Sequence, residues 1–259
     1  MRLRRRIAPL PLCLVLAPAP AGAEPLLAWY EVRAGRLTIM QVEALLQLDG
    51  PRYRIVTRLH TTGLASLFLH GEQLALAEGA WRGAEPVPFT YRVEGRWRGN
   101  LRRVVIDYAR PGQPRLQAVE PPNEAERETV PEGLQRGTTD ALSAMAKLAR
   151  SVALTGRCDG EAAIFDGRRR ADYRASTSGV ERLPAEGAFH GEALRCAFEG
   201  RIIAGFRRGD DPEEARQPQF GTAWLARVLP SAPPLPVRIE VPSRWFGTIR
   251  VVLTGLRPG

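Results

Sequence analysis

Alternating apolar and polar positions dominate the first half of the chain, and turn residues interrupt them at regular intervals. This period of two is typical of strands with one buried face. Asp49-Gly50 predicts a tight hairpin because both residues tolerate positive φ. A further turn is predicted at Glu78-Gly79, and the apolar segment 62–69 fits either a strand or a short helix. The predicted strands are 29–48 with a break at Ala34-Gly35, 52–60, 73–77, 87–97, 101–108 and a short strand ending near Val119.

The second half of the chain returns to strand patterns after residue 160. Asp166-Gly167 separates two such segments and predicts the clearest hairpin of the chain. Gly200 separates two others and predicts a second pair. The segments concerned are 161–165 with 168–176, 190–198 with 201–206, and then 220–228, 235–241 and 248–253.

One segment between these halves follows a helical period instead. It predicts a helix from Thr139 or Asp140 to about Val152, preceded by side-chain oxygens suited to an N-cap and followed by Gly156. The polar stretch 120–137 contains three prolines and predicts a long surface connection. The apolar stripe of the helix consists of Leu142, Met145, Leu148, Ala149 and Val152.

Two β-rich halves with about a dozen strands therefore flank one helix. Each half alone has few strands with which to cover its apolar face, so we expect residues 24–259 to form a single β-rich domain. The predicted fold class is mainly β: a single large antiparallel curved sheet, half-barrel or barrel, with one central helix at about 139–152.

The first 23 residues differ from the rest. Four arginines precede an apolar, proline-broken segment, and Ala21-Gly22-Ala23 supplies small residues at the end. This pattern predicts a secretory signal peptide cleaved after Ala23, and hence a periplasmic protein. No later run is long and apolar enough for a transmembrane helix, although contact with a membrane surface is compatible with the sequence.

Charge changes this picture little. The formal net charge is +9, and without the four leader arginines it is +5. A basic exported protein can bind anionic lipid or envelope polymers. We expect no nucleic-acid partner, because export separates the protein from nucleic acid and no binding module occurs.

The cysteine positions predict one disulfide. Cys13 lies within the apolar part of the leader and does not fit a lipidation site. Cys158 and Cys196 remain in a compartment that oxidises thiols, and 38 positions separate them, whereas redox-active pairs usually lie close together. A structural Cys158–Cys196 bridge is therefore expected.

Catalytic signatures are missing from the sequence. There is no Gly-x-Ser-x-Gly elbow, no His-Glu-x-x-His and no phosphate loop. Ser143 and Lys147 are four positions apart, which differs from the Ser-x-x-Lys motif, and are expected on the helix surface. We therefore expect no enzyme activity, no metal and no cofactor. A glycosidase-like pair of carboxylates is not visible in one sequence and stays open.

Two weak candidates for ligand contact remain. Arg168, Arg170 and Arg174 all stand at even-numbered positions, so on a strand their side chains would lie on one face. That face is either exposed to solvent or a contact for an anion or lipid headgroup. Trp245-Phe246 follows Pro242 in a turn-like segment, where the pair either packs over a barrel end or touches a ligand or membrane interface.

Scattered short segments carry a family resemblance. They are Trp29-Tyr30-Glu31-Val32 with Gly35, residues 133–148 with Thr139-Asp140-Ala141-Leu142-Ser143, Cys158, 165–170, Cys196, Trp224-Leu225, 235–238 and Gly247. In these the chain resembles an exported family of Gram-negative bacteria known as domain of unknown function 3108. The resemblance implies an envelope protein rich in antiparallel β structure, and it implies no catalytic residues.

These observations favour a non-enzymatic envelope protein that binds an apolar, lipid-like ligand in its curved sheet. One alternative is a structural or assembly role on another envelope protein. A further alternative is a carboxylate-based hydrolase of envelope polysaccharide.

Overall fold

Thirteen strands form one antiparallel sheet in the computed structural model, which describes residues 24–64, 66, 70–230, 232–243 and 247–259. The strands that precede the helix are β1 (Leu26–Ala34), β2 (Leu37–Gln47), β3 (Arg52–Thr61), β4 (Gly71–Arg82), β5 (Glu85–Trp97), β6 (Asn100–Arg110) and β7 (Gln113–Glu120). Those that follow it are β8 (Gly160–Phe165), β9 (Arg170–Glu186), β10 (Phe189–Ala204), β11 (Gln219–Ala226), β12 (Leu235–Ser243) and β13 (Gly247–Pro258). The helices are α2 (Asn123–Glu126), α3 (Glu132–Gln135), α4 (Ala141–Thr155) and α5 (Pro212–Ala215).

The strand order follows the chain except at one place. Strands β7 to β1 lie in reverse sequence order, and β13 to β8 continue the sheet from there. The first and last strands pair antiparallel, with Leu26 opposite Pro258. The two predicted β halves are thus one curved sheet around one principal helix, which confirms the predicted fold class. The free edges of this sheet are β7 and β8.

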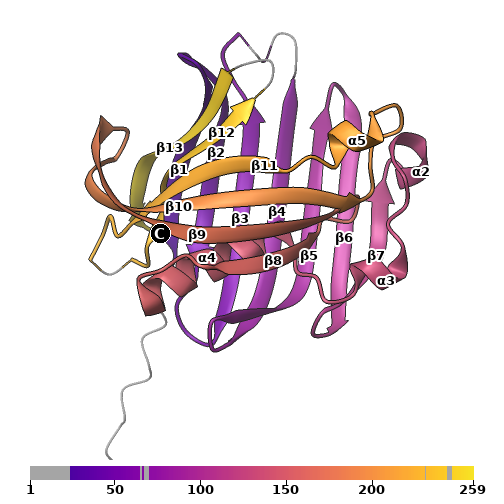
Figure 1. Cartoon of the computed structure of the whole chain (residues 1–259), viewed down its shortest axis with the longest axis horizontal. Helices are drawn as coiled ribbons and strands as arrows, with labels where there is room; N and C mark the ends of the chain where they lie inside the picture. Colours follow the sequence, from indigo (N-terminus) through magenta and orange to yellow (C-terminus); the bar gives the residue numbers. More distant parts are fainter. Residues whose placement is uncertain (1–23, 65, 67–69, 231, 244–246) are drawn as a thin grey trace, which may run out of the picture.

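The curvature brings the two halves face to face. In Figure 1, β8 to β11 cross in front of β3 to β7, and α4 lies between these two layers of strands. The helix contacts β4 and β5 on one side and β8 on the other. Because each half is apolar on its inner face, the helix covers surface that neither half covers alone.

The connector between β7 and α4 joins the two free edges. The backbone N–H of Gly137 donates to Gly112 O in the β6–β7 turn at 2.7 Å. Thr139 N donates to Ala163 O of β8 at 2.8 Å, and Phe165 N donates to Thr139 O at 2.9 Å. Most residues of the segment 120–137 are exposed, which agrees with the predicted surface connection, and the segment also contains the short helices α2 and α3.

Local signals explain the bounds of α4. Asp140 is the N-cap residue, and its carboxylate accepts a hydrogen bond from Ser143 N at 2.8 Å. Gly156 ends the helix in the left-handed conformation, with φ of 69°. The helix was thus correctly placed, but the prediction that Ser143 lies on its surface is wrong, because Ser143 is fully buried.

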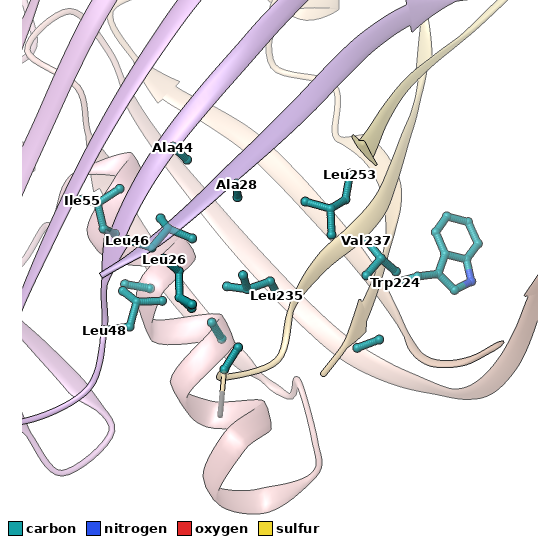
Figure 2. Close-up of a cluster of buried hydrophobic side chains, with 14 of the residues drawn as sticks. Leu26, Ala28, Ala44, Leu46, Leu48, Ile55, Trp224, Leu235, Val237 and Leu253 are labelled. Carbon is teal, nitrogen blue, oxygen red and sulfur yellow. The ribbon is translucent and has the colours of Figure 1, made fainter. Parts of the chain in front are cut away.

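The part of the core beside α4 contains many small and branched side chains packed between the helix and the sheet. Figure 2 shows Leu26, Leu46, Leu48 and Leu235 around α4, where they pack with Ala146 and Ala149 in one cluster. The small alanine side chains allow the helix to approach the strands closely.

Two predicted turns are absent because their glycines serve another purpose. Glu78-Gly79 lies inside β4, and Gly200 lies inside the long strand β10. A Cβ atom on Gly79 would come within 2.4 Å of the Tyr53 hydroxyl, and one on Gly200 within 2.5 Å of the Tyr173 ring. These glycines provide space for aromatic rings that lie across neighbouring strands. Half of the ambiguous segment 62–69, residues 65 and 67–69, lies outside the described residues.

Candidate functional site

An apolar cavity of about 330 Å³ lies between α4 and the inner face of β8 to β12. We call it the helix–sheet cavity. The helix contributes small residues, Ala141 and Ala144, together with Leu148. The opposite wall consists of Ala162, Ile164, Tyr173, Ala175, Phe198, Ala223 and Ile239. The space therefore suits a hydrocarbon chain better than a strongly solvated group.

Polar groups gather at one part of this cavity. Lys147 Nζ donates to Glu161 O at 3.0 Å and lies 2.8 Å from Glu85 Oε2. Arg174 pairs with the Glu161 carboxylate at 2.7 Å, and its side chain is 74% exposed. Ser151 also lines the helix–sheet cavity. The charges are balanced in pairs, so this end offers hydrogen-bond donors and acceptors beside water.

The disulfide forms part of the cavity wall. Cys158 and Cys196 are joined, as predicted, and both line the helix–sheet cavity. Each cysteine is 1% exposed. Cys158 comes three positions after α4 ends and Cys196 lies in β10, so the bond fixes the end of the helix against this wall.

A second apolar cavity, of about 180 Å³, borders the neighbouring face of α4. We call it the inner cavity. Leu142, Ala146 and Ala149 line it from α4, and residues of β1, β2, β3, β12 and β13 form its other walls. Met145 and Ile239 line both cavities.

A buried polar network lies at the start of α4. Ser143 Oγ donates to Asp140 Oδ2 at 2.6 Å and lies 2.7 Å from the Tyr53 hydroxyl. Asp140 and Ser143 are fully buried, and Tyr53 is 2% exposed. Burial raises the pKa of Asp140 to about 6, although the hydrogen bonds from Ser143 lower it. The network therefore anchors α4 to β3.

Two of the predicted arginines hold the connector. Arg168 donates to the carbonyl oxygens of Glu120 and Pro121, and Arg170 donates to Leu134 O at 2.8 Å. Their side chains are 15% and 14% exposed. Arg170 and Arg174 both line a polar pocket of about 600 Å³ over β8 to β10, whereas Arg168 does not. Of the three arginines, Arg174 also lies at the polar end of the helix–sheet cavity. The other predicted candidates, Trp245 and Phe246, lie outside the described residues.

Arg168→Ala is expected to lower the free energy of unfolding by about 2 kcal/mol, because hydrogen bonds from a charged, mostly buried donor to carbonyl oxygens of the connector are lost. The matched control, Arg174→Ala, removes an exposed ion pair and should cost less than about 1 kcal/mol. Urea unfolding monitored by tryptophan fluorescence measures both values. Equal losses in the two variants would contradict the assigned role of Arg168.

Neither a metal-binding cluster nor a membrane-spanning helix occurs in the described ranges. No group of three or more His, Cys, Asp or Glu side chains comes together there in a way that would hold a metal ion. No helix in the described part of the chain has the length and hydropathy needed to cross a membrane.

The sequence prediction missed both cavities. The one feature of the sequence that relates to both cavities is the alanine content of α4. Ala141 and Ala144 lie on the helix face beside one cavity, and Ala146 and Ala149 lie on the adjacent face beside the other. Alanine is also the best helix former, so this composition alone does not distinguish a cavity wall from a stable helix.

The fold and these cavities define an open, barrel-like β sheet that encloses a helix. A solved structure of this class is the beta-barrel-like protein of domain of unknown function DUF1849 from Brucella abortus, which is 11% identical with a TM-score of 0.54. The match covers 91% of this chain and 98% of that one, and it supports the fold alone. A search of curated proteins finds no match to the chain.

The chain itself belongs to the family described as protein of unknown function (DUF3108), whose model matches residues 26–254. This match confirms the family resemblance seen in the sequence. It covers almost all of the described sheet, from β1 into β13.

Proposed function

We propose that the protein is an exported, non-enzymatic binding protein that holds the apolar chain of a lipid-like ligand in the helix–sheet cavity. The observation that carries this proposal is the cavity of about 330 Å³ with its mostly apolar walls. Ligand pockets commonly range from about 300 to 1,000 Å³ and combine an apolar lining with a few polar groups. The signal-peptide pattern of residues 1–23 supports a periplasmic location for this function.

The polar end of the cavity gives the ligand an orientation. Burying a polar headgroup among Ala162, Ile164 and Phe198 would cost free energy, because these side chains form no hydrogen bonds. Near Lys147 and Arg174, the same headgroup finds donors and water. We therefore expect the hydrocarbon chain to enter first and the headgroup to stay at this end.

The carboxylates of the cavity support a non-enzymatic role. Asp159 pairs with Arg157 and Glu161 pairs with Arg174, each at 2.7 Å. Hydrogen bonds from Thr177 lower the pKa of Asp159. A general acid of the glycosidase type requires a raised pKa, so Asp159 does not fit that role.

Ala144→Trp is expected to reduce ligand occupancy about tenfold or more, because the indole fills space between α4 and the sheet. Ala153→Trp is the matched control, since Ala153 is an exposed alanine of the same helix. Native mass spectrometry of proteins released by osmotic shock and kept free of detergent measures occupancy, and organic extraction identifies the bound molecule.

We expect a stoichiometric apolar adduct on the wild type and on the Ala153→Trp variant, and its loss from the Ala144→Trp variant. A wild-type protein that carries no adduct, and takes up no fatty acid when titrated, would contradict the proposed function.

A further inference from the structure

The two cavities along α4 meet at a single helix position. Counting from Met145, the residues at i−4, i−1 and i+3 line the helix–sheet cavity, and those at i−3, i+1 and i+4 line the inner cavity. On an α-helix these two sets lie on opposite sides of the residue at position i. Met145 therefore projects between the cavities, and Ile239 of β12 borders both of them from the sheet.

Met145 is suited to a movable partition. Its side chain is unbranched and has three rotatable bonds, which lets methionine adapt to the shape of what it contacts. The residue is 40% exposed, although it lies in the apolar stripe that faces the interior. Incomplete packing leaves room for the thioether to change rotamer without displacing the helix.

The polar groups are distributed unequally between the two cavities. Lys147, Ser151 and Arg174 line the helix–sheet cavity. The inner cavity is lined by apolar side chains apart from Tyr30 and Thr57. A chain that extends past Met145 would thus end in an apolar environment, with its headgroup still at the polar end of the first cavity.

We propose that the helix–sheet cavity and the inner cavity form one binding channel, and that Met145 determines the length of the acyl chain that the channel accepts. The ligand is a single-chain amphiphile with an unbranched hydrocarbon chain. Short chains occupy the helix–sheet cavity alone, whereas longer chains displace the Met145 side chain and continue into the inner cavity. This inference rests on the proposed function and adds a specificity-determining residue to it.

The test is a chain-length series of straight-chain fatty acids, from octanoate to stearate, titrated by calorimetry into the delipidated protein. Each methylene group that becomes buried should raise the affinity about fourfold, until the accessible channel is full. A plot of log Kd against chain length therefore has a break that marks the length of the channel.

Met145→Trp should close the passage and move this break to shorter chains. Affinity for stearate should fall about tenfold or more, while affinity for octanoate should change less than about twofold. Ile239→Trp narrows the same passage from the sheet and should produce the same shift if the Met145 variant does not fold. Leu154→Trp is the control, because Leu154 is 61% exposed on α4 and lines neither cavity.

The Ala144→Trp variant distinguishes the two levels of the proposal. If it weakens binding at every chain length while the break stays unchanged in the Met145→Trp and Ile239→Trp variants, the role of Met145 is overturned and the proposed function stands. If the Ala144→Trp variant binds every fatty acid as tightly as the wild type, the helix–sheet cavity is not the site and both proposals fail.

Discussion

Replacing Cys158 and Cys196 together by alanine is expected to lower the free energy of unfolding by about 4 kcal/mol. The bond closes a loop with a sequence separation of 38 residues. In the chain-entropy model, a cross-link of this span removes about that much conformational freedom from the unfolded state. Urea unfolding of the double variant and of the oxidised wild type, under identical conditions, measures the difference.

Reduced wild-type protein provides the control for this prediction. It keeps both cysteine side chains, which pack with Val152, Ala223 and Leu225, and loses the cross-link alone. We expect most of the destabilisation to appear already on reduction, with a smaller further loss in the double alanine variant from weaker packing. Equal stability of the reduced and oxidised proteins would contradict a stabilising bridge. Free thiols at both positions in unreduced peptides would contradict the bridge itself.

Local patterns explain how much of the fold was predictable. Alternation of apolar and polar residues marked the hairpins of the first half, and the Asp140 cap and Gly156 marked the ends of α4. The pairing of β1 with β13 has no local signal, because it joins residues at opposite ends of the chain. The sequence therefore predicted a curved sheet with a central helix, but not where the sheet begins and ends.

The errors have a common physical cause. Gly79 and Gly200 were assigned to turns, because a glycine between two apolar segments usually marks one. In the structure an aromatic ring from a neighbouring strand occupies the space that a side chain would take. Ser143 was assigned to the helix surface for a similar reason, since its partner Tyr53 is 90 residues away in the sequence. Contacts between distant residues decide all three positions.

The candidate site was less predictable than the fold. Alternation along a strand placed Arg168, Arg170 and Arg174 on one face. In the structure Arg168 and Arg170 donate hydrogen bonds to the connector, and of the three only Arg174 lines the helix–sheet cavity. The cavities depend on the distance between α4 and the sheet, which no pattern within either element specifies. A list of alanines on a helix indicates small side chains, and whether other side chains fill the space beside them depends on the opposite wall.

Asp140 should make the protein less stable as the pH rises from about 4 to about 6. Burial raises the pKa of this carboxyl to about 6, from an ordinary value of 3.8. Between these values the folded protein binds a proton that the unfolded chain has lost, so the free energy of unfolding falls with increasing pH. The full penalty applies above about pH 6 and amounts to about 3 kcal/mol. Below about pH 4 the carboxyl is protonated in both states, and the penalty is absent.

Asp140→Asn isolates this effect. Asparagine keeps a side-chain oxygen that can accept the hydrogen bond from Ser143 N, and it is a good N-cap residue that does not titrate. The free energy of unfolding of the wild type minus that of the variant should therefore fall by about 3 kcal/mol between about pH 4 and about pH 7. Urea unfolding curves across this range measure the difference.

Other carboxylates act in the opposite direction but cancel in this comparison. Hydrogen bonds lower the pKa of Glu126 and of Asp159, so their contribution to stability is lost as the pH falls, in the wild type and in the variant alike. Asp49→Asn, in an exposed turn, provides the matched control and should show no such trend. A difference that stays constant with pH, or one that favours the wild type at higher pH, would show that Asp140 ionises in the folded protein without penalty. In that case, the buried network with Ser143 and Tyr53 would stabilise the charged carboxylate, and the same network would hold α4 most firmly at neutral pH.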